Sequence, residues 1–134
     1  MGAVLFDMDG TLIDSEPLWQ RTEAKIVASF GKVWTKEDGD TLTGHSLFDS
    51  ASLMIELKNL PLAPEKGVEM MVANMHELYA GEGVPWIPGA RELLSELASA
   101  GIPTALVSAS YEILVHDVCA VSYTHLTLPT TPYV

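Results

Sequence analysis

Two short apolar runs constrain the fold of this chain more than any other feature. Ala3–Phe6 (AVLF) and Thr104–Val107 (TALV) each stop at polar residues, which is typical of a buried parallel strand whose carboxyl end carries a loop. The periodic segments between and after these runs are helical. The pattern predicts an α/β fold with parallel strands, interrupted near its start by a long helical insertion.

Five segments place apolar residues at helical spacing. They run from Pro17 to Phe30, from about Leu47 to Lys58, from Val68 to Tyr79, from Ala90 to Ala100 and from Tyr111 to Val118. Glycines follow several of these segments and are expected to end the helices. The methionines of the third segment are expected to fill a core, because a flexible apolar side chain suits irregular gaps.

Composition narrows the class of protein. The 134 residues suffice for one sizeable core but not for two full domains. A net charge of −11 disfavours binding to nucleic acid and to anionic membrane surfaces. The single cysteine, Cys119, cannot form an internal disulfide, and the first apolar run is too short for a signal peptide or a membrane span. These observations favour a cytoplasmic protein.

The sequence after the first apolar run carries the strongest chemical signal. Asp7, Met8, Asp9, Gly10 and Thr11 stand where the predicted strand enters a loop, and open α/β sheets build active sites at such places. Side chains alternate along an extended segment, so both carboxylates are expected on one side. One can then act as a nucleophile, while a divalent cation offsets their mutual repulsion.

Two stretches resemble a known family. "VLFDMDGTLIDSEPLW" and "ALVSAS" are similar to the first and second motifs of the haloacid dehalogenase-like superfamily. The helical insertion resembles the α-helical cap of the phosphoglucomutase-like and sugar-phosphate phosphatase branch. The resemblance implies a partial Rossmann-like core, formed by residues 1–15 and 86–120, and a helical cap formed by residues 16–85.

The same resemblance implies a role for individual residues. Asp7 would attack phosphorus, and Asp9 would protonate the leaving oxygen and later activate water. Mg²⁺ would be bound by the Asp7 carboxylate and the Asp9 backbone carbonyl. Ser108 would hydrogen-bond the phosphoryl group, with the Ala109 N–H close by. The implied activity is Mg²⁺-dependent hydrolysis of small phosphorylated metabolites, with sugar phosphates favoured.

Further residues are expected to contact the substrate. Gly10 allows a sharp turn and a close approach of substrate to the backbone, and Thr11 follows it in the same loop. The loop Thr43–Ser46 matches the place where relatives recognise their substrate, so His45 is a candidate binding residue. An ordinary exposed loop histidine is the alternative for His45. The oligomeric state stays open.

Three other functions compete with phosphate hydrolysis. A sugar-phosphate mutase shares the chemistry of Asp7 and Asp9, but its relatives often carry a histidine about where Trp19 stands. A 2-haloacid dehalogenase lacks the second acid. A non-catalytic phosphoacceptor module of the response-regulator type places its acidic pair and its acceptor on different strands. The sequence therefore favours a phosphatase and leaves the mutase open.

The last fourteen residues, 121–134, differ from the rest of the chain. "VSYTHLTLPTTPYV" contains no Asp, Glu, Lys or Arg, and one frame of a transposase-type sequencing adapter encodes its first ten residues. We therefore expect this tail to be non-native and the family's core to be truncated. The lysine and the acidic pair of the family's later motifs have no match here, so this chain is expected to be inactive.

Overall fold

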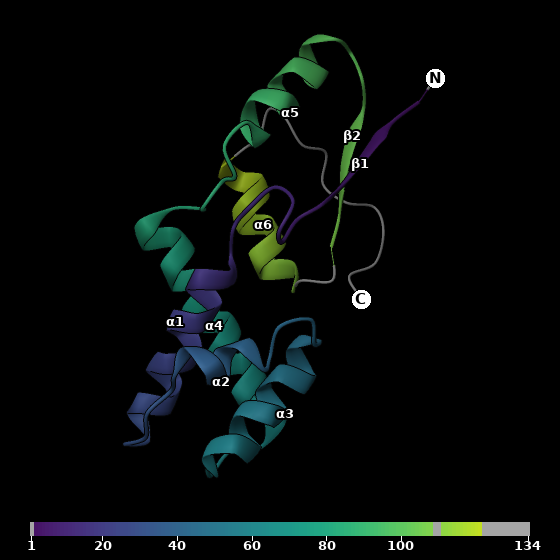
Figure 1. Ribbon diagram of the computed structural model, residues 1–134. Coiled ribbons are helices and arrows are strands. Elements are labelled where there is room, and N and C mark those ends of the chain that lie inside the picture. The colour runs from purple at the N-terminus through teal and green to yellow at the C-terminus, as the bar shows by residue number, and fades with distance from the viewer. Residues whose placement is uncertain (1, 109–110, 122–134) are drawn as a thin grey trace. The chain divides into compact units, whose positions relative to one another are not determined.

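The computed structural model describes residues 2–108 and 111–121. The elements follow in the order β1 (Val4–Asp7), α1 (Glu16–Ser29), α2 (Lys36–Asp40), α3 (Leu47–Lys58), α4 (Pro64–Glu82), α5 (Ala90–Ser99), β2 (Thr104–Val107) and α6 (Glu112–Val121) (Figure 1). The predicted α/β class with parallel strands and an inserted helical segment is confirmed. The tail predicted for residues 121–134 lies outside the described residues, except that Val121 ends α6.

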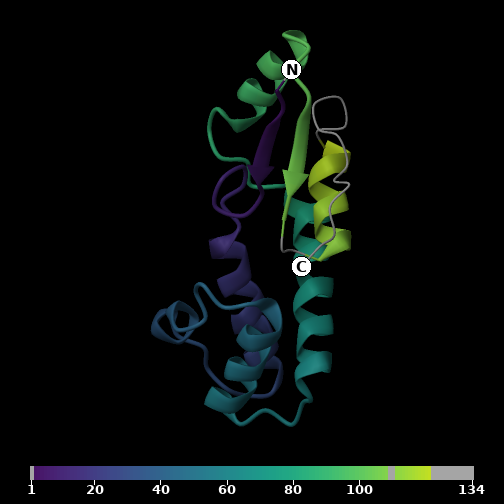
Figure 2. The same cartoon turned by 90° about the vertical axis from the view of Figure 1, so that its right-hand side faces the viewer.

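The two predicted strands pair with each other. β1 and β2 run parallel, with Val4 opposite Thr104 and Asp7 opposite Val107, and Figure 2 shows their arrows side by side. Phe6 and Leu106 occupy facing positions and are both buried. Leu5, which points to the other side of the sheet, is 66% exposed. In the described residues, one face of this sheet is therefore covered and the other is open.

Contacts divide the described residues into two compact units. The sheet unit contains residues up to Glu16 together with those from Leu78 onward, and the helical unit is Pro17–Glu77. In the sheet unit, α5 contacts β2. The helical unit has its own apolar core, and the buried residues that form it are Ile26, Val27, Leu42, Ala51, Met54, Leu60, Val68 and Met71. The domain boundaries drawn from the sequence at residues 16 and 85 stay a prediction.

The helices agree with the apolar periodicity, with one omission. Helix α3 has the predicted bounds, and α4 begins earlier than predicted because Pro64 fits the first turn of a helix. Helix α4 continues through Gly81, and Gly83, at φ +90°, follows its last residue. Helix α2 was not predicted, because five residues are too few to show a periodicity.

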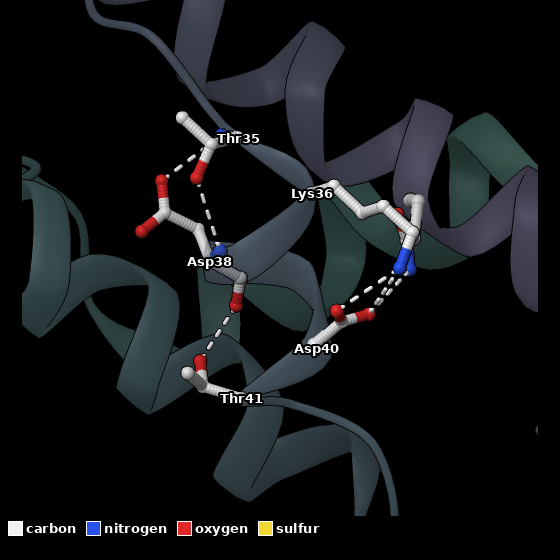
Figure 3. A network of polar contacts seen from close by, with 6 residues as sticks. Thr35, Lys36, Asp38, Asp40 and Thr41 are labelled. Atoms are coloured by element: carbon white, nitrogen blue, oxygen red, sulfur yellow. Dashed lines mark hydrogen bonds and ion pairs between the residues drawn. The ribbon is translucent and has the colours of Figure 1, made fainter.

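Local hydrogen bonds explain why α2 forms. The Asp38 N–H donates to Thr35 Oγ1 at 3.1 Å and the Thr35 N–H donates to Asp38 Oδ2 at 2.9 Å, which is a capping box (Figure 3). Lys36 pairs with Asp40 at 3.1 Å, one turn further along the helix. The spacing of Thr35 and Asp38 was therefore a usable signal in the sequence.

In the described residues, no helix is both long and apolar enough to cross a membrane.

Truncating a side chain to alanine should change the stability of the chain differently on the two faces of the sheet. Leu106→Ala should lower the free energy of unfolding by about 2–5 kcal/mol, because Leu106 is fully buried opposite Phe6. Leu5→Ala, on the open side, should change it by only about 0.5 kcal/mol. Urea unfolding of the 134-residue chain, followed by circular dichroism, measures both. Equal losses in the two variants would contradict the assignment of the covered face.

Candidate active site

The carboxyl ends of the two strands bring the predicted acidic residues and Ser108 to one edge of the sheet. Asp7 is the last residue of β1 and lies opposite Val107, so Ser108 follows directly after the partner of Asp7. Asp7 is exposed, Asp9 is half-buried and Ser108 is buried. The parallel register therefore places an accessible carboxylate and a hydroxyl side chain at neighbouring strand ends.

The loop after Asp7 is tightly folded. The N–H groups of Thr11, Leu12 and Ile13 all donate to the Met8 carbonyl, at 3.3, 3.0 and 3.2 Å. Gly10 has a φ of +81°, in the left-handed region, which a side chain would disfavour. The side chains of Met8, Leu12 and Ile13 are almost completely buried and anchor the loop. The loop thus holds Asp9 on a fixed backbone.

Each carboxylate of the pair accepts a hydrogen bond from a nearby donor. The Met8 N–H donates to Asp7 Oδ1 at 2.9 Å, and the Ser15 hydroxyl donates to Asp9 Oδ1 at 2.5 Å. Ser15 is buried. From the sequence, Ser15 was interpreted as a helix cap, so its contact with Asp9 was missed. A serine two residues before a proline gives no signal that separates these roles.

The segment of residues 85–87 is hydrogen-bonded to the loop that follows β1. The Asp14 N–H donates to the Pro85 carbonyl and the Ile87 N–H donates to the Leu12 carbonyl, both at 2.8 Å. Between these bonds, Ile13 pairs with Trp86 in an isolated bridge, and Ile13 also pairs with Asp9. The segment that returns from the helical unit is therefore bonded to the loop that carries Asp9.

The structure brings together most of the predicted site residues. Asp7, Asp9, Gly10, Thr11 and Ser108 all belong to the sheet unit, at the ends of its two strands or in the loop after β1. His45 is exposed in the helical unit, directly before the cap of α3, and its part in the site stays a prediction. Ala109 lies outside the described residues.

Acidic residues at this edge of the sheet could bind a divalent cation. Carboxylate and carbonyl oxygens of the kind that Asp7 and Asp9 supply suit Mg²⁺, which commonly takes one or two carboxylates and fills its shell with water and phosphate oxygens. Among residues 2–108 and 111–121, no group of three or more His, Cys, Asp or Glu side chains could hold a metal ion. The oxygens of Asp7 and Asp9 fit a hard cation that takes the rest of its shell from water and phosphate.

Cys119 is not a candidate nucleophile. It lies on α6 and is 6% exposed. Burial raises the pKa of its thiol, so little thiolate forms at neutral pH, and the thiolate is the reactive species. The Cys119 thiol is therefore not an accessible nucleophile.

The family model and the curated relatives that match this chain indicate the same family. The family model described as a haloacid dehalogenase-like hydrolase matches residues 1–123. Hexitol phosphatase B of Escherichia coli is 36% identical over 118 residues, which are 81% of this chain and 49% of that protein. The chain thus spans about half the length of the curated relatives it matches.

Solved structures share the fold. A crystal structure of mutant CbbY from Rhodobacter sphaeroides in complex with xylulose-(1,5)-bisphosphate has a TM-score of 0.78 and 21% identity, covering 97% of this chain and 64% of that one. Beta-phosphoglucomutase from Clostridium difficile has a TM-score of 0.64 and 21% identity, covering 87% and 54%. These similarities extend over both the sheet unit and the helical unit.

The buried thiol gives a direct test of the packing of α6. We expect Cys119 to react slowly with a disulfide reagent at pH 8 in the native chain and quickly in urea, because its raised pKa and its burial both suppress attack. Absorbance of the released thiolate measures the rate. The Cys119→Ala variant should give no signal, since the chain has one cysteine. Equal rates in buffer and in urea would contradict the buried position.

Proposed function

This chain belongs to the haloacid dehalogenase-like hydrolases, and on that premise we propose that it is part of a Mg²⁺-dependent phosphatase of small phosphorylated metabolites. Sugar phosphates are the favoured substrates, since hexitol phosphatase B is among its relatives. The observation that carries the proposal is the strand register, which sets exposed Asp7 opposite Val107, the residue directly before Ser108. Phosphoryl transfer needs such positioning and charge neutralisation more than elaborate covalent chemistry.

In the proposed reaction, an Asp7 carboxylate oxygen attacks phosphorus and the bond to the leaving oxygen breaks. Asp9 gives its proton to that oxygen. A water molecule then attacks the aspartyl-phosphate, Asp9 takes a proton from the water, and phosphate is released from Asp7. The Met8 N–H, which donates to Asp7 Oδ1 at 2.9 Å, orients the nucleophile. The Ser108 hydroxyl would donate to an oxygen of the transferring group.

A divalent cation fits this proposal. The Asp7 carboxylate and the Asp9 backbone carbonyl would hold Mg²⁺, which would neutralise negative charge on the phosphoryl group when bound. Gly10 and Thr11 follow in the loop and would line the phosphate site. The loop is suited to this because Gly10, at φ +81°, has no atom within 4 Å of the place of a Cβ, so the backbone is open to a ligand.

The helical segment would supply selectivity. We propose that residues 16–85 act as a cap that excludes water until the correct leaving group is bound, with His45 among the residues that contact it. His45 is exposed between Gly44, at φ +85°, and Ser46, the N-cap of α3. The turn that carries the exposed His45 imidazole is followed by the capped helix α3, so the imidazole can contact a ligand at little cost in free energy.

A mutase of the same family is the alternative. Beta-phosphoglucomutase shares the fold, and transfer to a second sugar hydroxyl would use the same Asp7 and Asp9. Hydrolysis is favoured because Trp19 stands about where mutase relatives often carry a histidine. A phosphoacceptor module is less compatible, because here both acids come from the end of a single strand.

Replacing the two acids one at a time tests the mechanism. In the full-length protein that contains these residues, Asp7→Asn should abolish phosphoenzyme formation, because an amide is a poor nucleophile. Asp9→Asn should slow turnover by about 10²–10⁴-fold and leave some trapped phosphoenzyme. Rapid-quench assays with a labelled sugar phosphate measure both effects. Glu96→Gln, at an exposed position of α5, is the control and should keep full activity. Undiminished turnover in both aspartate variants would refute the aspartyl-phosphate intermediate.

The 134-residue chain alone should have little activity. Only Arg91 among the seven Lys and Arg residues lies outside residues 17–77, so the sheet unit has little positive charge to offset phosphate. Leu5 and Val107 leave one side of the two-stranded sheet exposed, and so small a sheet is rarely stable by itself. A phosphatase assay with Mg²⁺ and a panel of sugar phosphates should find turnover in a chain extended to the length of its curated relatives and almost none in this chain. Equal, Asp7-dependent turnover in both would overturn this expectation.

A further inference from the structure

The backbone that leads to His45 is held by a hydrogen-bonded turn. The His45 N–H donates to the Leu42 carbonyl at 3.2 Å, which closes the turn. Gly44 precedes His45 at φ +85°, a conformation that a residue with a side chain rarely adopts. The Leu42 side chain is buried in the apolar core of the helical unit. The turn is therefore anchored in that core, while His45 itself stays exposed.

The backbone that follows His45 is held by the cap of α3. The Ser46 hydroxyl accepts a hydrogen bond from the Asp49 N–H at 3.1 Å, and the Ser46 carbonyl accepts one from the Ser50 N–H at 2.8 Å. Ser46 has the extended backbone of an N-cap, with φ −63° and ψ 162°. Without its hydroxyl, the Asp49 N–H would lose this partner and the first turn of α3 would open more readily.

The turn before His45 and the helix after it are also joined to each other. The buried Ser50 hydroxyl donates to the Leu42 carbonyl at 3.4 Å, and this is the same carbonyl that closes the turn at His45. The bond is long and so contributes little by itself. It forms only while the first turn of α3 is in place. The position of His45 therefore depends on the cap that Ser46 provides, and all of these contacts lie within the helical unit.

We propose that Ser46 is a positioning residue: by capping α3, its hydroxyl holds the His45 imidazole where it contacts the leaving group of a sugar phosphate. The inference rests on the proposed function, in which His45 contacts that group. Imidazole nitrogens can hydrogen-bond the hydroxyl groups of a sugar, and binding is tighter when the side chain is already in place before the ligand arrives. Ser46 itself touches neither the substrate nor phosphorus.

A helix cap can also serve stability alone, and Thr35 provides the matched comparison. Thr35 caps α2 in the same helical unit, and its hydroxyl accepts from the Asp38 N–H at 3.1 Å, the same distance as in the Ser46 cap. In the full-length protein, alanine at either position should lower the thermal unfolding midpoint by about 2–4 °C, because each change removes an N-cap. Only Ser46 is adjacent to His45 in the chain. A role in stability alone therefore predicts the same kinetics for the two variants.

The test measures the kinetics of these variants in the full-length protein, with a hexitol phosphate as substrate. Ser46→Ala should raise KM about three- to tenfold and change kcat less than about twofold, because a binding contact is lost and the chemical step is not. Thr35→Ala should leave both constants unchanged. Ser46→Asn, which can still cap α3, should keep KM within about twofold of the unsubstituted protein. The inhibition constant of inorganic phosphate should be the same in every variant, since phosphate carries no leaving group.

A double-mutant cycle shows whether Ser46 acts through His45. His45→Ala should raise KM at least as much as Ser46→Ala does, and adding Ser46→Ala to it should change KM less than about twofold further. The inference is overturned by an unchanged KM in Ser46→Ala or His45→Ala, by an equal rise in Thr35→Ala, or by a full further rise in the double variant. Full turnover of Asp7→Asn and Asp9→Asn would instead refute the proposed function, so the two failures are distinguishable.

Discussion

Parallel pairing of β1 with β2 is the interaction on which the candidate site depends. The two strands are separated by almost the whole described chain, yet their register sets Asp7 opposite Val107 and so puts Ser108 at the same edge. A slip of one residue would turn Phe6 or Leu106 from the covered face to the open one, which opposes any other register. Burial of one face of the sheet thus fixes the relative position of two chemical groups at its edge.

The loop after β1 converts this alignment into a rigid site. Three of its backbone N–H groups donate to the Met8 carbonyl, and its apolar side chains are buried. The segment around Trp86 also forms backbone hydrogen bonds with this loop. Only the polar side chains of the loop remain at the surface. The helical unit could vary in sequence without disturbing this arrangement, because its apolar core is separate.

The parts of the structure that depend on local pattern could be predicted from the sequence. Both strands were predicted within one residue of their bounds, and α3 was predicted to the residue, because apolar period and capping residues are encoded nearby. The position of Asp7, Asp9 and Ser108 at strand ends followed from the same pattern. The hydrogen bond from Ser15 to Asp9 depends on how the loop between these two residues folds, and periodicity carries no such information. Helix α2 could have been found from Thr35 and Asp38, which form its capping box.

The uneven distribution of charge has a consequence for how a ligand reaches this site. By sequence, the segments of the sheet unit contain nine Asp and Glu residues against a single arginine, Arg91, whose guanidinium lies over the Trp86 ring at 5.7 Å. At long range, this field repels a phosphate dianion instead of steering it inward. Capture would then rely on short-range hydrogen bonds, and added salt, which shortens the reach of the repulsion, would speed the encounter.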